Sequence, residues 1–76
     1  FRLRYSRDYT FGRVLEAGNM VRVKTNFDIR SGVKPGVHTF ENRVGARVGD
    51  RVRLAVERGS FNLRGGRVVG VMEVVG

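Results

Sequence analysis

The sequence predicts an all-β protein, a single small barrel of five or six strands over residues 1–76. Fourteen valines and eleven glycines favour short strands joined by tight turns. The second half also repeats the first, which indicates a pseudo-symmetric barrel. Gly18-Asn19-Met20-Val21-Arg22-Val23 returns as Gly49-Asp50-Arg51-Val52-Arg53-Leu54, and Phe27-Asp28-Ile29-Arg30 returns as Phe61-Asn62-Leu63-Arg64.

Residues 6–17 support two interpretations. Ser6 is a suitable N-cap for a short N-terminal helix, apolar residues follow at helical spacing, and Gly18 would end it. Gly12 in the middle and the β-favouring residues before it instead favour a strand over residues 9–15. The sequence leaves both interpretations open.

The chain after Gly18 is predicted to form strands. Residues 20–25 and 51–57 alternate apolar and polar side chains, as strands with one buried face do. Further strands are expected at residues 37–40, 44–48, 60–64 and 67–75, with a loop or short strand at 26–31 and reversals at Gly49-Asp50 and Gly65-Gly66. The two repeats are offset by 31 and 34 positions, which predicts a three-residue insertion near residues 57–59.

The last predicted strand is apolar on both faces, which a strand with one face in water would not be. We therefore expect one face to lie in the core and the other to contact a second copy of the chain. A domain of this length buries only about 60% of its unfolded surface, so association would add stability. The expected residues of this homo-oligomer interface are Val68, Val69, Val71, Met72 and Val74.

The charge of the chain points to an anionic partner. Fifteen basic residues face seven acidic ones, the net charge is +8, and thirteen of the basic residues are arginine. Arginine suits bidentate recognition of phosphate and carboxylate. A nucleic acid or another polyanion is therefore the expected partner, although arginines that form salt bridges between subunits would give the same composition.

The expected anion-binding residues lie in the repeated strands and in one turn. Both repeats carry basic residues at alternating positions, so their basic faces should lie on related surfaces of the barrel. Two glycines between arginines also permit close approach of a phosphate in the turn. The candidate nucleic-acid-binding residues are Arg22, Lys24, Arg51, Arg53, Arg64, Gly65 and Arg67.

Catalysis is not expected. The chain has no cysteine, and its one histidine, His38, lies three residues before Glu41, which would place the two on opposite faces of a strand. We expect no cofactor and no metal site, and we expect Phe27, Phe40 and Phe61 to belong to the core. No run of eighteen apolar residues is present, so membrane insertion is not expected.

Two segments resemble the motifs of Sm-like RNA-binding proteins. Residues 59–71 run from a glycine through Arg-Gly into a valine-rich strand, as the second motif of that family does. Residues 40–48 are similar to its first motif. The resemblance implies a strand-paired ring of subunits with Arg64 and Gly65 near a central RNA site.

Other small barrels are similar over shorter stretches, including PilZ-type nucleotide-sensing domains, whose signatures this chain misses. The sequence thus favours a non-enzymatic, oligomeric barrel that binds nucleic acid, RNA above all. The alternative is a structural subunit of a larger assembly, such as a viral capsid or tail or a bacterial appendage. In that case the arginines would contact acidic patches on neighbouring subunits.

Overall fold

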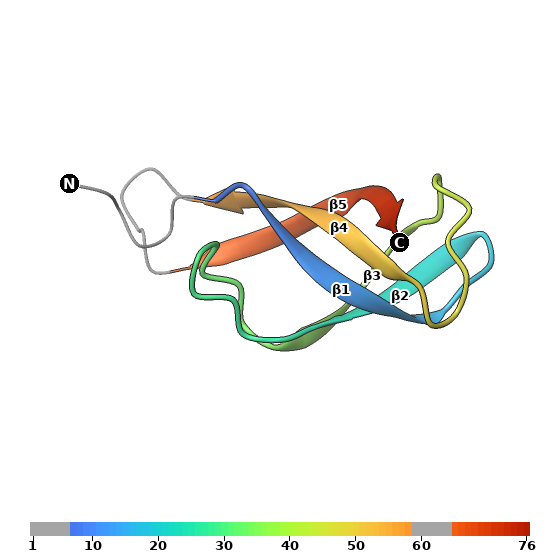
Figure 1. Ribbon diagram of the computed structural model, residues 1–76, viewed down its shortest axis with the longest axis horizontal. Helices are drawn as coiled ribbons and strands as arrows, with labels where there is room; N and C mark the ends of the chain where they lie inside the picture. The colour runs from blue at the N-terminus through green and yellow to red at the C-terminus, as the bar shows by residue number, and fades with distance from the viewer. Residues whose placement is uncertain (1–6, 59–64) are drawn as a thin grey trace.

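The computed structural model describes residues 7–58 and 65–76, and every regular element in these ranges is a strand (Figure 1). The all-β prediction is confirmed, and residues 7–17 contain no helix. The strands are β1 (Tyr9–Glu16), β2 (Met20–Thr25), β3 (Gly36–Glu41), β4 (Arg51–Arg58) and β5 (Gly66–Val75).

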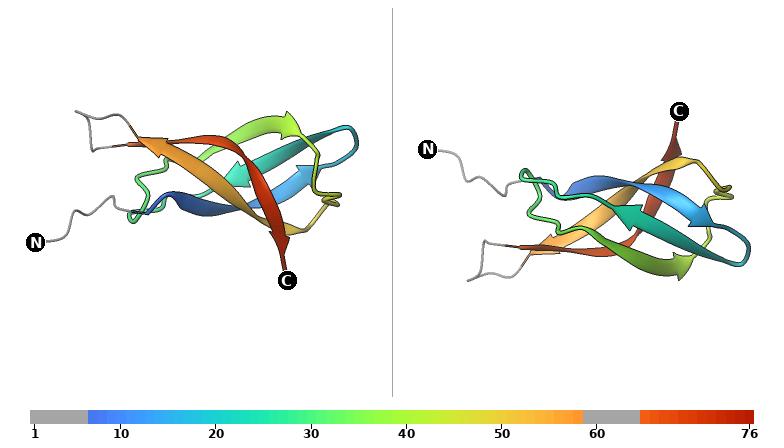
Figure 2. Two further views of the ribbon diagram at one scale, coloured as in Figure 1. Left: turned by 90° about the horizontal axis from the view of Figure 1, so that it is seen from above. Right: turned by 90° about the horizontal axis from the view of Figure 1, so that it is seen from below.

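The strands form one antiparallel sheet in the order β3-β2-β1-β4-β5, which curls into a half-barrel (Figure 2). The curl closes at one end. There Val33, just before β3, forms a parallel bridge with Gly66, whose N–H donates to the Gly32 carbonyl at 3.0 Å. A β-carbon on Gly66 would collide with the Ser31 carbonyl and with Val56, so glycine permits this close approach.

The core fills the inside of the curl and consists mainly of valine. In β2, Val21 and Val23 are completely buried while the residues between and beside them are exposed, as expected for a strand with one wet face. Burial of each such side chain contributes about 1.5–3 kcal/mol, which makes this cluster the main source of stability. The buried apolar residues are Val14, Val21, Val23, Val33, Ala46, Val52, Leu54, Val56 and Val68, and Phe40, Val44 and Val71 pack against them.

The helix predicted for residues 6–17 is wrong over the described part, and the alternative strand is confirmed as β1. β1 pairs with β2 on one side and β4 on the other, and it buries every second residue: Thr10, Gly12 and Val14. A β-carbon on Gly12 would overlap Val23, so the centre of the core has room only for glycine at this point. The helical spacing of Phe11, Val14 and Leu15 is misleading, because burial along this segment alternates with the period of two of a strand.

The strand predicted at residues 44–48 is also wrong, since residues 42–50 form an irregular connection between β3 and β4. The Asn42 side-chain amide donates to the carbonyls of Gly18 and Ala46, both at 3.0 Å. The side-chain oxygen of Asn42 accepts the Ala46 N–H, also at 3.0 Å. These side-chain bonds replace the ladder bonds of a strand, and they hold Ala46 in the core.

The repeated sequence segments become β2 and β4, which lie on either side of β1 and run in the same direction. Their registers against β1 are not the ones that the repeat implies. Arg13 lies opposite Lys24 of β2 and Arg51 of β4, whereas the repeat aligns Arg51 with Met20. The repeat therefore predicts the inward and outward faces correctly and the lateral alignment wrongly.

β5 differs from the other strands because two of its residues have no direct partner on β4. The register shifts twice, which leaves Val69 and Met72 as bulged residues. The insertion predicted near residues 57–59 extends to Gly59, outside the described residues, and residues 57 and 58 pair with β5 without a shift.

Several predictions concern the segment between β4 and β5. The strand predicted at residues 60–64, and with it Phe61 and Arg64, lies outside the described residues. Gly66, expected in a reversal, is instead the first residue of β5 and pairs with Arg58.

Candidate anion-binding site

The outer face of β2 and β4 carries the cations that the sequence indicated. Arg22 and Lys24 alternate with buried residues of β2, and Arg51 and Arg53 alternate with buried residues of β4. All four side chains therefore lie on the face of the sheet that is turned away from the core. Their surroundings on that face differ.

Three cations of the sheet lie directly opposite an acid, in pairs that we call the acid-paired rows. Each cation is the register partner of a glutamate on the neighbouring strand and forms an ion pair with it. The pairs are Arg22 with Glu16, Arg53 with Glu73 at 2.5 Å, and Arg67 with Glu57 at 2.7 Å. Exposed pairs of this kind contribute about 0–1 kcal/mol to stability, but they neutralise the charge that an anion would meet.

A fourth row contains three cations and no acid. Arg13 of β1 lies opposite Lys24 on one side and Arg51 on the other, and we call these three residues the cationic row. Within residues 7–58 and 65–76, no carboxylate lies within ion-pair distance of any of them. Arg13 donates one long hydrogen bond, of 3.5 Å, to the Gly49 carbonyl. Like charges placed directly opposite destabilise a sheet, so a bound anion would relieve this row.

A pocket of about 360 Å³ opens at the cationic row. All three cations line it, together with Phe11, Gly12 and Asn26. The Arg51 guanidinium carbon lies 4.2 Å from the centre of the Phe11 ring, a cation–π distance that restrains this arginine. Asn26 adds an amide that can both donate and accept. The pocket combines concentrated positive charge with one flat apolar surface.

The aromatic residues of β1 extend this surface along the strand. The Tyr9 and Phe11 rings contact each other edge to face with centroids 5.6 Å apart. Arg53 lies 5.4 Å from the centre of the Tyr9 ring, and Arg7 lies 4.7 Å from it. Arginine and aromatic side chains are thus interleaved on the outer face, as they are in surfaces that bind single-stranded nucleic acids.

Sequence reasoning missed the centre of this site. The sequence does not single out Arg13 or Phe11 as binding residues, because it leaves their segment open between a helix and a strand. The available signal was the β-favouring run Tyr9-Thr10-Phe11, since in a strand Phe11 and Arg13 share the face opposite to Thr10 and Val14. A firm assignment of the strand would have placed Arg13 among the candidate residues.

The structure does not bring Gly65 and Arg67, the described residues of the predicted turn, to the cationic row; Arg64 lies outside the described residues. Arg67 pairs with Glu57, which lies six residues along β4 from Arg51, a distance of about 20 Å along a strand. Gly65 is half-buried and near Gly32 at the closed end of the barrel.

The predicted interface residues of β5 fall on two sides of the strand. Val68 is buried in the core, and Val71 packs against the core. Val69, Met72 and Val74 are 45%, 48% and 39% exposed. The bulges turn the first two of these outward.

Two of the phenylalanines expected in the core are described. Phe40 packs against the core, whereas Phe27 is 58% exposed in the loop before β3, so its placement in the core is wrong. His38 approaches the Thr25 hydroxyl at 3.3 Å, and Glu41 pairs with Arg43.

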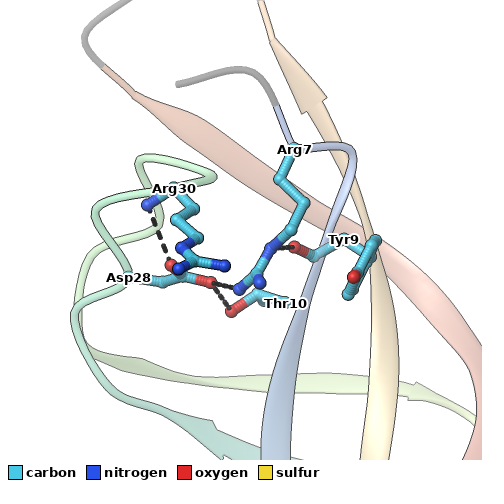
Figure 3. A network of polar contacts seen from close by, with 5 residues as sticks. All are labelled: Arg7, Tyr9, Thr10, Asp28 and Arg30. Carbon is cyan, nitrogen blue, oxygen red and sulfur yellow. Dashed lines mark hydrogen bonds and ion pairs between the residues drawn. The ribbon is translucent and has the colours of Figure 1, made fainter. Parts of the chain in front are cut away.

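A second polar cluster surrounds Asp28 at the closed end of the barrel (Figure 3). Arg7 and the Thr10 hydroxyl donate to one carboxylate oxygen of Asp28 at 2.8 and 2.7 Å, and the Arg30 N–H donates to the other at 2.9 Å. Partial burial raises the pKa of Asp28, but these hydrogen bonds outweigh burial and hold the pKa at about 2, below the ordinary 3.8. We call this cluster the Asp28 network; it fastens the loop before β3 to β1.

The fold and the pocket together define a small, basic half-barrel with a cationic site on its outer face. Over residues 1–72 the chain matches a family model, and it belongs to this family, DUF2101, which is described as predicted membrane proteins. No curated protein and no solved structure matches the chain. In the part of the chain that the structure describes, no helix is long and apolar enough to span a bilayer.

Proposed function

We propose that this domain is a non-enzymatic module that binds nucleic acid, RNA above all, through the outer face of β2, β1 and β4. The cationic row is the observation that carries the proposal. Lys24, Arg13 and Arg51 lie opposite one another on three adjacent strands, and no described carboxylate pairs with them. The other strand cations whose side chains are described, Arg22, Arg53 and Arg67, each pair with a glutamate. Most contacts between proteins and nucleic acids are made to phosphate, which such a row would attract.

The aromatic residues of β1 support a nucleic acid over a simple anion. Tyr9 and Phe11 lie on the same face as the cationic row and are partly exposed. Arg51 and Arg53 cover their rings at cation–π distance. Bases stack well on guanidinium planes as well as on aromatic rings, so this layer offers a platform beside the phosphate contacts.

The test is fluorescence anisotropy of a labelled single-stranded RNA, titrated at a series of salt concentrations. The logarithm of the association constant should fall linearly with the logarithm of the salt concentration. Arg13→Gln and Arg51→Gln should each weaken binding and reduce the slope by about 1. Arg67→Gln is the matched control, because it removes the same charge from an acid-paired row. Absence of binding at low salt, or an equal loss in the control, contradicts the proposal.

Vesicles of anionic phospholipid are the necessary second ligand, because the family is described as predicted membrane proteins. They are tested by co-sedimentation with the same three variants. If vesicles bind through the cationic row and RNA does not bind, the proposal of nucleic acid is wrong.

A second candidate function is a structural subunit of a larger assembly, such as a viral capsid or tail or a bacterial appendage. The exposed apolar residues of β5, Val69, Met72 and Val74, favour it, because they lie on an edge strand that a second copy would cover. The ring implied by the resemblance to Sm-like proteins would also pair edge strands. Sedimentation velocity over a micromolar concentration series should then show association, which Met72→Lys should weaken; a monomer at every concentration contradicts it.

A further inference from the structure

The cationic row concentrates its charge at one point of the face instead of spreading it along a path. Neighbouring strands lie about 4.8 Å apart, so Lys24, Arg13 and Arg51 fall within about 10 Å across three adjacent strands. The cations on either side along β2 and β4, Arg22 and Arg53, are neutralised by glutamates. A strand of nucleic acid that crossed this face would therefore meet one strongly positive point and not a continuous basic track.

The amount of charge matches one particular phosphate group. A phosphodiester within a chain carries a single negative charge, whereas a terminal phosphate monoester carries about −1.5 to −2 at neutral pH and has three acceptor oxygens. Three cations around one pocket suit the monoester, because a diester would leave most of the positive charge uncompensated. Arginine also forms paired hydrogen bonds to phosphate, and two of the three cations are arginines.

The rest of the pocket has the size and chemistry for the nucleotide that bears such a phosphate. Its volume of about 360 Å³ lies at the lower end of the range for small-molecule sites. Phe11, with Arg51 at 4.2 Å, offers a stacking surface, and Asn26 offers an amide that can pair with a base or a sugar. Gly12 lines the pocket with its backbone, because its β-carbon position faces the core.

We propose that this pocket binds the terminal phosphate monoester of a nucleic-acid strand, with Arg13 at the centre and Lys24 and Arg51 on either side. The inference rests on the proposed function and makes it more specific: the domain recognises an end of the strand. A strand that ends in a hydroxyl group binds to the same face through its diesters alone and therefore binds more weakly.

The experiment compares three RNA oligonucleotides of one sequence: one with a 5′-phosphate, one with a 3′-phosphate and one with hydroxyl groups at both ends. Their affinities are measured by anisotropy at one salt concentration. The wild-type protein should bind one phosphorylated RNA about tenfold more tightly than the hydroxyl-ended RNA. The ratio should fall to about 1 in Arg13→Gln and in Lys24→Gln, and it should persist in Arg67→Gln. Circular dichroism establishes that each variant is folded. If either Arg13→Gln or Lys24→Gln fails to fold, the other still tests the pocket.

Each outcome has a separate meaning. Equal affinity for all three RNAs overturns the terminal-phosphate site and leaves the proposed function standing. No binding of any RNA overturns both. A preference for the phosphorylated RNA that survives in Arg13→Gln and Lys24→Gln shows that the end is recognised elsewhere, which also overturns the assignment of this pocket.

Discussion

The Asp28 network and the cationic row are two charged clusters on the same small sheet, and they are opposite in composition. In the first, one carboxylate accepts hydrogen bonds of 2.7–2.9 Å from Arg7, from Thr10 of β1 and from its own loop. In the second, three cations lie in adjacent strands, and no described carboxylate forms an ion pair with them. The charge of Asp28 is compensated by contacts within the protein, whereas the charges of the cationic row are not compensated by any described residue.

This difference separates a charge that stabilises the fold from charges that no described residue compensates. A partly buried carboxylate with several hydrogen bonds stabilises the folded state, because those bonds favour its ionised form. An exposed row of like charges does the reverse and slightly destabilises the sheet. Changes in the first region should therefore alter stability, and changes in the second should alter binding.

The largest expected effect on stability comes from disrupting the close approach at Gly66, at the same end of the barrel as the Asp28 network. Gly66→Ala should lower the free energy of unfolding by about 3 kcal/mol, because the added β-carbon collides with the Ser31 carbonyl as well as with Val56. Urea denaturation followed by circular dichroism measures the change. Gly70→Ala in the same strand is the control and should be nearly neutral, since nothing lies within 4 Å of its β-carbon. Similar losses in both variants would contradict the close approach at Gly66.

The next effect tests the Asp28 network directly. Asp28→Asn should lower the free energy of unfolding at pH 7 by about 2 kcal/mol, because it removes the charged acceptor of Arg7 and Thr10. In the wild type the folded pKa of Asp28, about 2, lies below its ordinary 3.8. The stabilisation is therefore complete above pH 5 or so and is lost as the pH falls through 3.8 towards 2.

Denaturation curves at several pH values between 7 and 2 check this effect. The difference between wild type and Asp28→Asn should shrink as the pH falls, until the two curves converge. Thr10→Val keeps the carboxylate and removes one donor, so its smaller loss should also diminish at low pH. A difference that is constant across the whole range would mean that the Asp28 charge contributes nothing to stability.

The faces of the strands were predictable from the sequence, and the lateral alignment between strands was not. Alternation of valine with arginine in residues 20–25 and 51–57 is enough to place Arg22, Lys24, Arg51 and Arg53 on the outer face. Whether each of these cations meets an acid depends on the register of strands that are distant in the sequence. The repeat implied one register, and hydrogen bonding with β1 and β5 established another.

Bulges and side-chain hydrogen bonds account for the remaining differences. Nothing in the run of valines in β5 indicates that Val69 and Met72 would be bulged, because both fit an ordinary strand. The strand predicted at residues 44–48 fails because Asn42 offers its backbone a different set of partners. Such choices depend on tertiary contacts and not on local propensity.

A smaller effect, of opposite sign, is expected in the cationic row. Arg13→Glu replaces two repulsive cross-strand pairs with two attractive ones, to Lys24 and to Arg51, and should raise the free energy of unfolding by about 1 kcal/mol. The same variant should abolish RNA binding. Arg22→Glu is the control: it places a glutamate opposite Glu16, so it should destabilise the protein slightly. If Arg13→Glu were destabilising, the row would not be repulsive in the wild type.

The smallest expected effect is the response of stability to salt, and it isolates the repulsion within the cationic row. At 1 M salt the Debye length falls to about 3 Å, so the repulsion of Arg13 by Lys24 and Arg51 is screened. Salt screens the net positive charge of every variant, so the informative quantity is a difference between variants. Wild type should gain about 0.3 kcal/mol more than Arg13→Gln between low and high salt. Arg67→Gln removes the same charge from an attractive pair and should gain at least as much as wild type, because it has lost an ion pair that salt would weaken. Equal gains in Arg13→Gln and Arg67→Gln would show that only net charge matters, and the distinction between the cationic row and the acid-paired rows would then have no energetic basis.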